Sequence, residues 1–396
     1  MEENPFKVLH VFGKAYDRGY AYGSLMADDL MRFIDVDLQE FYKDEVDQIP
    51  LDDLPKWLQD IIKDPLKLAA PEVFDLALAY VYERQKEHIA SSPANVWDEA
   101  DGIVEGMCSV KKCDAASYKK KIRHVNMLPE LIRMQCSMMG AWGKATPNDE
   151  KLVQLRTLDF GTGPFANVTF LHVSHPEEEN SVPFASLSFP GFVGLVTGFS
   201  KYVGQCEKVD DVTGKKRPRG TYDGQAVSMV IRDMLQFSET KENAIEIAKN
   251  AKRTWSVWLG VGDTKSQEFD AILYYMEEAR VLNDTTLPAL TNQSYFEDVA
   301  YIDKHPQPSS SDDTMTDLVK QYYGNLSASN VVQNFPRLMQ SGDVHVAAYD
   351  MGTRVAYVSR GMTDSKGQFL RYAYEAPFLS FDMDMLWNEK KRTAVE

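Results

Sequence analysis

The chain has 396 residues, of which 44% are hydrophobic and 26% charged, a composition typical of a folded protein with an ample core. Its 59 acidic residues outnumber its 43 basic residues and give a formal net charge of −16, which argues against a nucleic-acid partner. No run of 18 apolar residues occurs, so we expect no membrane span, and residues 1–5 lack the basic and apolar regions of a signal peptide.

Helical patterns dominate the chain up to residue 135. Val73, Leu76, Ala77, Tyr80 and Val81 recur at the spacing of one helical face. Further helices are predicted over residues 25–34, 54–62 and 97–107.

Strand patterns appear after residue 136. Short apolar runs, separated by Gly and Pro, predict strands over residues 151–160, 167–173, 183–187, 191–197, 255–261 and 271–276. Helices are predicted over residues 225–237 and 242–249, and residues 305–311 are typical of a loop. A hairpin is predicted from strands 344–349 and 354–359, which flank Asp350-Met351-Gly352-Thr353. This order favours an α+β fold in which helices cover stacked antiparallel sheets.

Four cysteines are too few for a disulfide framework, and none has the spacing of a zinc site. Cys108 and Cys113 lie five residues apart and are able to pair, although we expect both to be free. The seven histidines are scattered along the chain. The sequence therefore predicts neither a metal nor a cofactor.

Cys136 is the candidate nucleophile, and Arg156 and Asp159 follow it on a predicted strand. A thiol is a weak nucleophile until a base or a positive charge activates it. Cleavage between Gln135 and Cys136 would free an α-amino group with an ordinary pKa of roughly 7.7–8.0, which is a suitable base. Attack of the thiol on the Gln135 carbonyl would make this cut.

Arg156 is expected to stabilise the thiolate or hold a substrate oxygen, and Asp159 to orient the α-ammonium group. Residues three apart on an extended strand point to opposite faces. We therefore expect a bulge or bend near Thr157 to bring both side chains to one site. The residues alone leave another interpretation open, in which Cys136 is a small buried hydrophobe and the Arg-x-x-Asp pattern is a coincidence.

Several segments together resemble one enzyme family. The family has a nucleophile followed by Arg-Asn-x-Asp on the next strand, and Cys136-Ser137-Met138 and Arg156-Thr157-Leu158-Asp159 are similar to these motifs. Residues 191–200 are similar to its Gly-rich segment, and Thr291-Asn292 is similar to its Thr-Asn pair. Residues 13–23 and 99–106 are similar to two glycine-containing segments upstream of the nucleophile. Through these motifs, which span about residues 10–360, the chain resembles the cysteine N-terminal-nucleophile (Ntn) hydrolases that include acid ceramidase, N-acylethanolamine-hydrolysing acid amidase and the isopenicillin-N acyltransferases.

The resemblance implies roles for further residues. Asn292 would supply the oxyanion-hole amide, and loss of such a donor typically costs about 10²–10³ in rate. Glu207 and Gly194 would bind substrate, and residues 189–199 are expected either to line an acyl channel or to be ordinary core strands. The chain departs from the family pattern at Thr157, where Asn is common, and at Ser137, where Thr is common.

The resemblance also implies a four-layer αββα sandwich, with residues 1–135 as a helical α-subunit-like segment and residues 136–396 as a β-subunit-like catalytic part. The implied activity is hydrolysis of linear amide bonds in N-acylated lipids, such as ceramides or N-acylethanolamines, after self-cleavage into an α/β heterodimer. Two alternatives stay open: an acyltransferase of the isopenicillin-N type and a non-catalytic lipid-binding member of the fold. The expected partner is a small-molecule N-acyl amide or lipid, and no cofactor is expected.

The sequence gives conflicting indications of the cellular compartment. Four Asn-x-Ser/Thr sequons and the family favour the lysosome or secretion, whereas the first residues favour a truncated start or the cytosol. Asn292 lies in one sequon and is expected to be unmodified; the other sequons begin at Asn167, Asn283 and Asn325. Residues 215–219 are expected to form a solvated basic loop, and residues 119–123 a solvated helical face.

Overall fold

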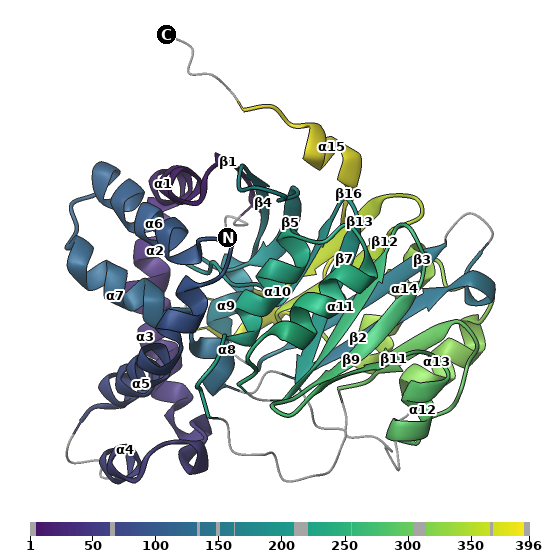
Figure 1. The fold of residues 1–396 in the computed structure, drawn as a ribbon, viewed down its shortest axis with the longest axis horizontal. Helices are drawn as coiled ribbons and strands as arrows, with labels where there is room; N and C mark the ends of the chain where they lie inside the picture. Colours follow the sequence, from purple (N-terminus) through teal and green to yellow (C-terminus); the bar gives the residue numbers. More distant parts are fainter. Residues whose placement is uncertain are drawn as a thin grey trace.

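The computed structural model describes residues 5–63, 68–132, 135–147, 151–161, 163–209, 221–254, 256–304, 314–364 and 367–391. Two large sheets lie at its centre, and helices cover them (Figure 1). The predicted loops at residues 215–219 and 305–311 lie outside the described residues.

The part of the chain before residue 133 is mainly helical, as predicted. Its helices are α1 (Ala15–Leu25), α2 (Ala27–Arg32), α3 (Leu38–Asp44), α4 (Lys56–Ile62), α5 (Ala70–Ala90), α6 (Val96–Val110), α7 (Ala115–Val125) and α8 (Leu128–Leu131), with a π-helical turn at Phe33–Asp37 and 3₁₀ turns at Val46–Gln48 and Leu51–Asp53. The helices predicted over residues 73–81 and 97–107 are confirmed as α5 and α6. The helix predicted from residue 54 begins at Lys56, because Pro55 is its extended N-cap residue. One strand, β1 (Val8–Gly13), was not predicted.

The larger sheet has eight strands. In spatial order they are β1, β4 (Phe170–Pro176), β5 (Phe184–Ser188), β6 (Thr197–Ser200), β7 (Val203–Val209), β8 (Val257–Asp263), β9 (Phe269–Tyr274) and β10 (Ala279–Leu282). β1 pairs with β4 in parallel, and the other neighbours are antiparallel. The N-terminal segment therefore supplies an edge strand to a sheet built from the rest of the chain.

The second sheet has six antiparallel strands. Their order is β11 (Val299–Ile302), β2 (Gln135–Trp142), β3 (Leu152–Asp159), β12 (His345–Asp350), β13 (Val355–Arg360) and β16 (Leu379–Asp382). The predicted hairpin is confirmed as β12 and β13, paired from His345 with Arg360 to Asp350 with Val355. β14 (Met362–Thr363) and β15 (Phe369–Arg371) form a separate two-stranded ribbon.

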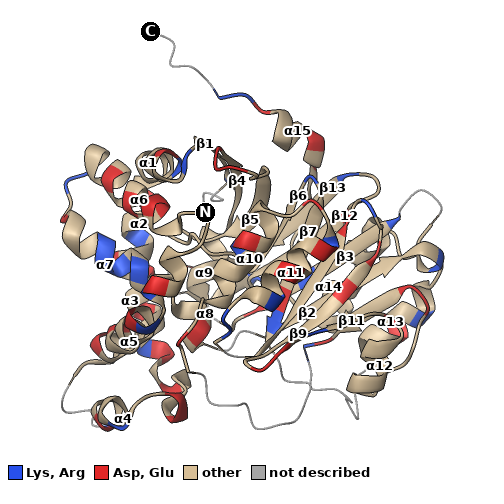
Figure 2. Ribbon diagram, viewed as in Figure 1, with Lys and Arg blue, Asp and Glu red and all other residues tan. Residues whose placement is uncertain are grey.

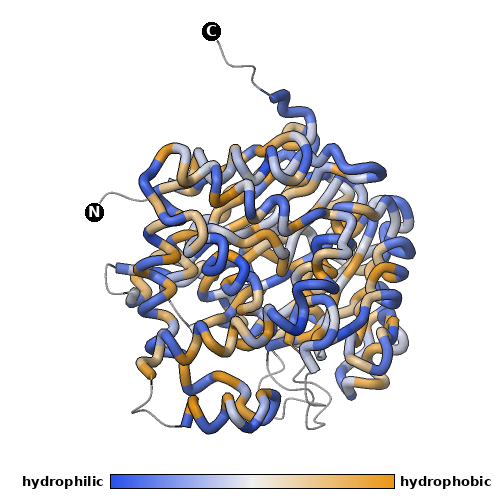
Figure 3. Tube along the Cα trace, turned by 60° about the vertical axis from the view of Figure 1, so that its left-hand side comes forward, coloured by the Kyte–Doolittle hydropathy of each residue, from blue (hydrophilic) through white to orange (hydrophobic). Residues whose placement is uncertain are grey.

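Buried side chains between these elements define four layers. Met138 and Tyr349 from the six-stranded sheet pack against Trp258 and Phe269 from the eight-stranded sheet. α10 (Val227–Gln236) and α11 (Lys241–Asn250) cover the outer face of the larger sheet, and α13 (Thr314–Tyr322) and α14 (Ala328–Met339) cover that of the smaller one. Figure 3 shows hydrophobic and hydrophilic stretches alternating along the chain. The predicted αββα fold is thus confirmed.

The remaining short elements are α9 (Gly163–Val168), α12 (Thr286–Thr291), α15 (Met383–Asn388) and 3₁₀ turns at Gly143–Ala145 and Ala373–Glu375. Within the described parts of the chain, no helix is both long and apolar enough to cross a bilayer.

Two strand predictions were wrong in part. Residues 191–196 are irregular, and β6 begins only at Thr197. Gly191 has a φ of +83°, and the Asn126 Oδ1 accepts hydrogen bonds from the backbone N–H groups of Val193 (2.9 Å) and Gly194 (3.2 Å), so these donors are not available to a neighbouring strand. The strand predicted over residues 167–173 begins at Phe170, because α9 extends to Val168.

The prediction that Cys108 and Cys113 are free was also wrong, because they form a disulfide. α6 ends at Val110, and the chain turns back before α7, which brings the two Cα atoms to 5.3 Å. This separation lies within the usual range for a disulfide.

Helices α1 and α6 pack backbone against backbone through four glycines. A Cβ on Gly23 would lie 1.9 Å from the Ile103 carbonyl oxygen, and one on Gly106 would lie 2.0 Å from the Tyr20 carbonyl oxygen; Gly19 and Gly102 are equally crowded. A side chain at any of these positions would force the helices apart.

Gly23→Ala is expected to lower the free energy of unfolding by about 1–3 kcal/mol, because the added methyl group overlaps the backbone of α6. Chemical denaturation measures the change. Leu25→Ala is the control, since that side chain is 67% exposed on the same helix. Equal stability of Gly23→Ala and the parent chain would contradict this close packing.

A buried ion-pair cluster joins the helical segment to α10 and to the loop between β4 and β5. Glu99 on α6 accepts hydrogen bonds at Oε2 from Arg18 Nη2 (3.0 Å) and Arg232 Nη2 (2.8 Å). Arg18 also donates from Nη1 to Glu178 Oε2 (2.7 Å). Burial alone would raise the pKa of Glu99, but Arg232 and Arg18 lower it to about 2. The carboxylate therefore stays charged at neutral and at mildly acidic pH.

Candidate active site

Strands β2 and β3 position the predicted nucleophile and its cation. In their antiparallel register, Cys136 lies opposite Leu158, and Met138 lies opposite Arg156. Residues two apart on a strand share a face, so Cys136 and Arg156 are diagonal neighbours on the same side of the sheet. That side faces the eight-stranded sheet, and the site lies between the two sheets.

The Cys136 thiol is fully buried and contacts two charged side chains. Arg156 Nη2 donates a hydrogen bond to its Sγ at 3.3 Å, and Glu207 Oε1, on β7, lies 3.9 Å from the sulfur. The same Arg156 nitrogen donates to Glu207 Oε1 at 2.9 Å. The structure thus brings Cys136, Arg156 and Glu207 together.

His345 completes this cluster and was missed by the sequence analysis. It begins β12, and its Nε2 lies 2.6 Å from Arg156 Nη1. Burial and the neighbouring Arg156 hold the pKa of His345 well below its ordinary value, so the ring is neutral and accepts this hydrogen bond. Its ring also stacks on Phe189, with centroids 5.9 Å apart. No sequence motif marks His345, because its place depends on which strand pairs with β3.

Burial controls the charge of the cluster. It raises the pKa of the Cys136 thiol well above its ordinary value; Arg156 opposes this shift, and Glu207 and Asp159 add to it. Burial also raises the pKa of Glu207, against the attraction of Arg156. In the uncut chain the sulfur is therefore held as a thiol beside a cation.

Asp159 lies on the other face of the sheet. The expected bulge near Thr157 is absent, since the register of β3 with β2 and with β12 is unbroken. Asp159 accepts hydrogen bonds from Ser341 Oγ (2.6 Å) and the Gly342 backbone N–H (2.8 Å). In the ladder it lies opposite Gln135, so Arg156 and Asp159 approach the Gln135–Cys136 junction from opposite faces.

A hydroxyl network surrounds Asp159. Ser341 Oγ lies 2.6 Å from Thr157 Oγ1 and 3.1 Å from Ser137 Oγ, and the Thr157 oxygen accepts from the backbone N–H of Ser137 at 3.0 Å. Thr157, which departs from the family pattern, is therefore fully engaged next to the nucleophile. This network fixes the backbone of β2 immediately after Cys136.

A polar cleft of about 540 Å³ opens at the Gln135 side of the junction. Gln135 is exposed there, and Asp159, Asp343 and Lys304 are among the other lining residues. Burial and the nearby Asp159 raise the pKa of Asp343 to about 6. The peptide bond before Cys136 thus lies at the boundary between solvent and core.

A small apolar pocket of about 10 Å³, nearly filled by its own side chains, lies beside this cleft. Its walls are aromatic and aliphatic: Leu128, Pro129, Ile132, Phe160, Phe165, Phe189, Phe192 and Val196. Ile132 and Phe160 also line the polar cleft, so the two cavities share a wall. Cys136 belongs to the same buried cluster as these apolar side chains.

Two predicted residues lie away from the thiol contacts. Gly194 is in the irregular segment before β6, where a Cβ would lie 2.6 Å from Ser228 Oγ. Asn292 is exposed at the C-terminal end of α12, with a left-handed φ of 56°. Across the part of the chain that the structure describes, no hydrogen bond links either residue to Cys136, and no three His, Cys, Asp or Glu side chains are placed to hold a metal ion.

Three solved structures share part of this architecture. The N-acylethanolamine-hydrolyzing acid amidase ortholog of Caenorhabditis elegans is 17% identical, with a TM-score of 0.40 over 55% of this chain and 93% of that one. Penicillin V acylase from Agrobacterium tumefaciens is 12% identical (TM-score 0.41; 64% and 89% covered), and a mutant conjugated bile acid hydrolase from Clostridium perfringens is 11% identical (TM-score 0.36; 65% and 97% covered).

No protein-family model matches the sequence. Two proteins of Dictyostelium discoideum match nearly all of it. Protein dcd1B is 30% identical over 411 aligned residues, which cover 98% of this chain and 76% of that protein. Protein dcd1A is 30% identical over 414 aligned residues, which cover 98% and 87%. The chain therefore belongs to the family of the Dictyostelium dcd1 proteins.

Proposed function

We propose that the chain is an autoprocessed cysteine amidohydrolase that cleaves linear amide bonds of N-acylated lipids through an acyl-thioester. The observation that carries this proposal is the 3.3 Å contact between the buried Cys136 thiol and the Arg156 guanidinium, one residue after the exposed Gln135. A positive charge beside sulfur is an arrangement that activates thiol nucleophiles.

Self-cleavage comes first. The Cys136 sulfur attacks the carbonyl carbon of Gln135, the C–N bond between the two residues breaks, and the Cys136 nitrogen leaves as an amine that takes up the thiol proton. Water then hydrolyses the thioester, which leaves a carboxylate on Gln135 and a free thiol on Cys136. The exposure of Gln135 to the polar cleft supports this step, because water reaches the junction from that side.

Substrate hydrolysis follows from the new chain end. The freed amine takes the thiol proton, and the sulfur attacks the acyl carbonyl of the substrate while Arg156 stabilises its charge. Asp159 is proposed to accept hydrogen bonds from the resulting α-ammonium group, which then protonates the leaving amine. Water hydrolyses the acyl-thioester to a carboxylate and regenerates the thiol.

Asn292 is proposed as the oxyanion donor on the sequence resemblance. It is exposed at the end of α12 in the uncut chain, so this role requires the end of α12 to move after cleavage.

The paired cavities support an amphiphilic substrate. The polar cleft suits a hydrogen-bonding head group, and the adjoining apolar side chains, which include Phe189, Phe192 and Val196, suit an acyl chain once their pocket opens beyond its present volume of about 10 Å³. Glu207 and Gly194 are proposed to contribute to binding, Glu207 through its contact with the thiol and Arg156.

We propose a lysosomal or secreted location. The disulfide between Cys108 and Cys113 supports an oxidising compartment, since such bonds are rare in the cytosol. The exposed Asn292 would have to escape glycosylation at its sequon.

Cys136→Ala is expected to abolish both chain cleavage and amide hydrolysis, because it removes the attacking sulfur. Intact mass after incubation at acidic and at neutral pH detects a break between Gln135 and Cys136, and fatty-acid release from N-acyl amides detects turnover. Cys206→Ala is the matched control, since Cys206 is the other free buried cysteine among the described residues and lies on the neighbouring β7. It is expected to cleave normally.

The alternatives are outcomes of the same experiment. An added amine that captures the acyl group in place of water would identify an acyltransferase. A chain that stays whole at both pH values and turns over no amide would contradict the enzyme and favour a lipid-binding protein.

A further inference from the structure

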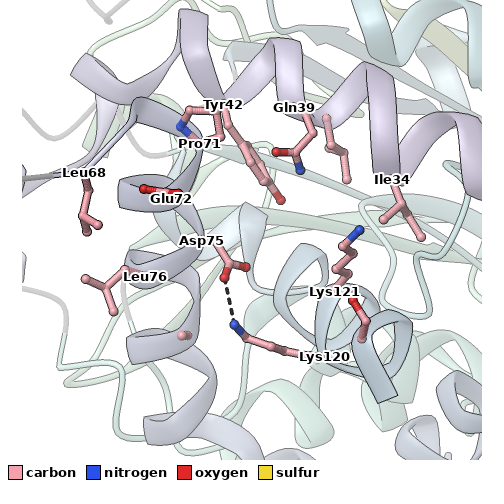
Figure 4. Close-up of a pocket in the computed structure, with 13 residues that line it drawn as sticks. Ile34, Gln39, Tyr42, Leu68, Pro71, Glu72, Asp75, Leu76, Lys120 and Lys121 are labelled. Carbon is pink, nitrogen blue, oxygen red and sulfur yellow. Dashed lines mark hydrogen bonds and ion pairs between the residues drawn. The ribbon is translucent and has the colours of Figure 1, made fainter. Parts of the chain in front are cut away.

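A third cavity, of about 410 Å³, lies among α3, α5 and α7 (Figure 4). It shares no lining residue with the polar cleft or the apolar pocket beside Cys136. Ile34, Leu38, Leu76 and Ala79 are among its apolar walls. Its volume and its largely apolar lining are those of a small-molecule site.

The Tyr42 hydroxyl faces this cavity without a partner. The Tyr42 side chain is 5% exposed, its ring stacks on Phe74 with centroids 4.4 Å apart, and its hydroxyl has no hydrogen bond to any described residue. In Figure 4 it points into the open space between the helices. Burial, with a contribution from Asp75, raises the pKa of this phenol above its ordinary value, so it remains a donor. The hydroxyl is therefore free to donate to an acceptor group of a ligand in the cavity.

Two lysines of α7 add further donors at the cavity. Lys120 Nζ lies 3.1 Å from Asp75 Oδ2, and Lys121 Nζ lies 2.6 Å from Asp35 Oδ1. Figure 2 shows basic residues, drawn in blue, on α7. An ammonium group has three N–H donors, so each lysine keeps donors beyond its ion pair.

The principal acid of the cavity is already satisfied. Asp75 Oδ1 lies 2.7 Å from His124 Nδ1, and its Oδ2 pairs with Lys120. Glu72, the other acid of the lining, is exposed and accepts a hydrogen bond from the Ala69 backbone N–H at 3.2 Å. Donors therefore exceed free acceptors at the polar end of the cavity. This balance favours a ligand whose head group accepts hydrogen bonds.

We propose that this cavity binds a single-chain carboxylate amphiphile, such as a medium-chain fatty acid. Its chain lies against the apolar walls, and its carboxylate accepts hydrogen bonds from Tyr42, Lys120 and Lys121. The site is separate from the nucleophile and does not depend on the proposed hydrolysis.

Calorimetric titration of the full-length protein with dodecanoate, below its micellar concentration, tests this site. Tyr42→Phe is expected to weaken binding about 10-fold, because it removes one hydrogen bond to a charged group. Ala79→Phe fills the cavity and is expected to abolish this binding. Tyr80→Phe is the matched control, since Tyr80 lies on α5 outside the lining and is expected to leave affinity unchanged. Dodecyltrimethylammonium, which has the same chain and a cationic head, is expected not to bind there.

Three results would overturn the proposal. They are no binding of dodecanoate, binding that neither Tyr42→Phe nor Ala79→Phe weakens, and equal binding of the cationic amphiphile. Thermal unfolding of each variant verifies that it is folded. Tyr42→Phe removes a hydroxyl with no protein partner among the described residues, so it is expected to be as stable as the parent chain.

Discussion

Arg156→Met is expected to slow self-cleavage at Gln135–Cys136 by about 10²–10³-fold, the usual effect of removing one charge-stabilising donor from a reaction centre. Arg156 Nη2 contacts the sulfur directly and is the main group that lowers the thiol pKa against burial. Without Arg156 the pKa of the Cys136 thiol rises further, so the remaining self-cleavage should reach its highest rate at a higher pH than in the parent chain. The fraction of cleaved chain, followed by mass over time at several pH values, measures both effects.

A second variant separates chemistry from folding. Arg156→Met leaves Glu207 as a buried, unpaired carboxylate, which by itself destabilises the protein. Arg156→Met/Glu207→Gln removes that charge and is expected to recover much of the stability while cleavage remains slow. Recovery of normal cleavage in the double variant would show that Arg156 acts only through the fold.

Glu99→Gln is expected to lower the free energy of unfolding by about 3–5 kcal/mol, the usual effect of removing one partner from a buried ion pair. Arg18 and Arg232 both donate to this carboxylate, and both are fully buried. Denaturant titration at neutral pH measures the change. Asp101→Asn on the same helix is the control, since its ion pair with Arg123 is partly exposed and is expected to contribute about 0–1 kcal/mol. Similar losses in the two variants would contradict the structural role of the cluster.

The same carboxylate gives the fold a defined response to acid. The pKa of Glu99 is about 2 in the folded chain and 4.5 as its ordinary value. Because the folded pKa is the lower one, the stabilisation is complete above about pH 4.5 and is lost as the pH falls from there toward 2. The cluster therefore stays intact at mildly acidic pH, and Glu99→Gln should lack this part of the acid dependence.

The local parts of the candidate site could be predicted from the sequence. A thiol at the start of one strand and Arg156 on the next become diagonal neighbours once the two strands pair in antiparallel register. The hairpin around Asp350-Met351-Gly352-Thr353 was predictable for the same reason, because its turn residues and its strands are close together in the chain.

Contacts between distant segments could not be predicted in this way. His345 meets Arg156 only because β12 pairs with β3, and the disulfide forms because the chain reverses between α6 and α7. We predicted a bulge near Thr157 because we expected Arg156 and Asp159 to act from the same face of the sheet. The unbroken strand instead places them on opposite faces, where they approach the same peptide bond.

Strand β1 links the two pieces that self-cleavage would produce. Residues 8–13 are hydrogen-bonded to β4. Arg18 forms an ion pair with Glu178, and Glu99 forms one with Arg232. Glu178 and Arg232 both come after the proposed cut. A polypeptide that began at Cys136 would present β4 as an open sheet edge and would bury Arg232 without its carboxylate. If the chain is cut at Cys136, the severed pieces are therefore expected to copurify until the fold itself is denatured.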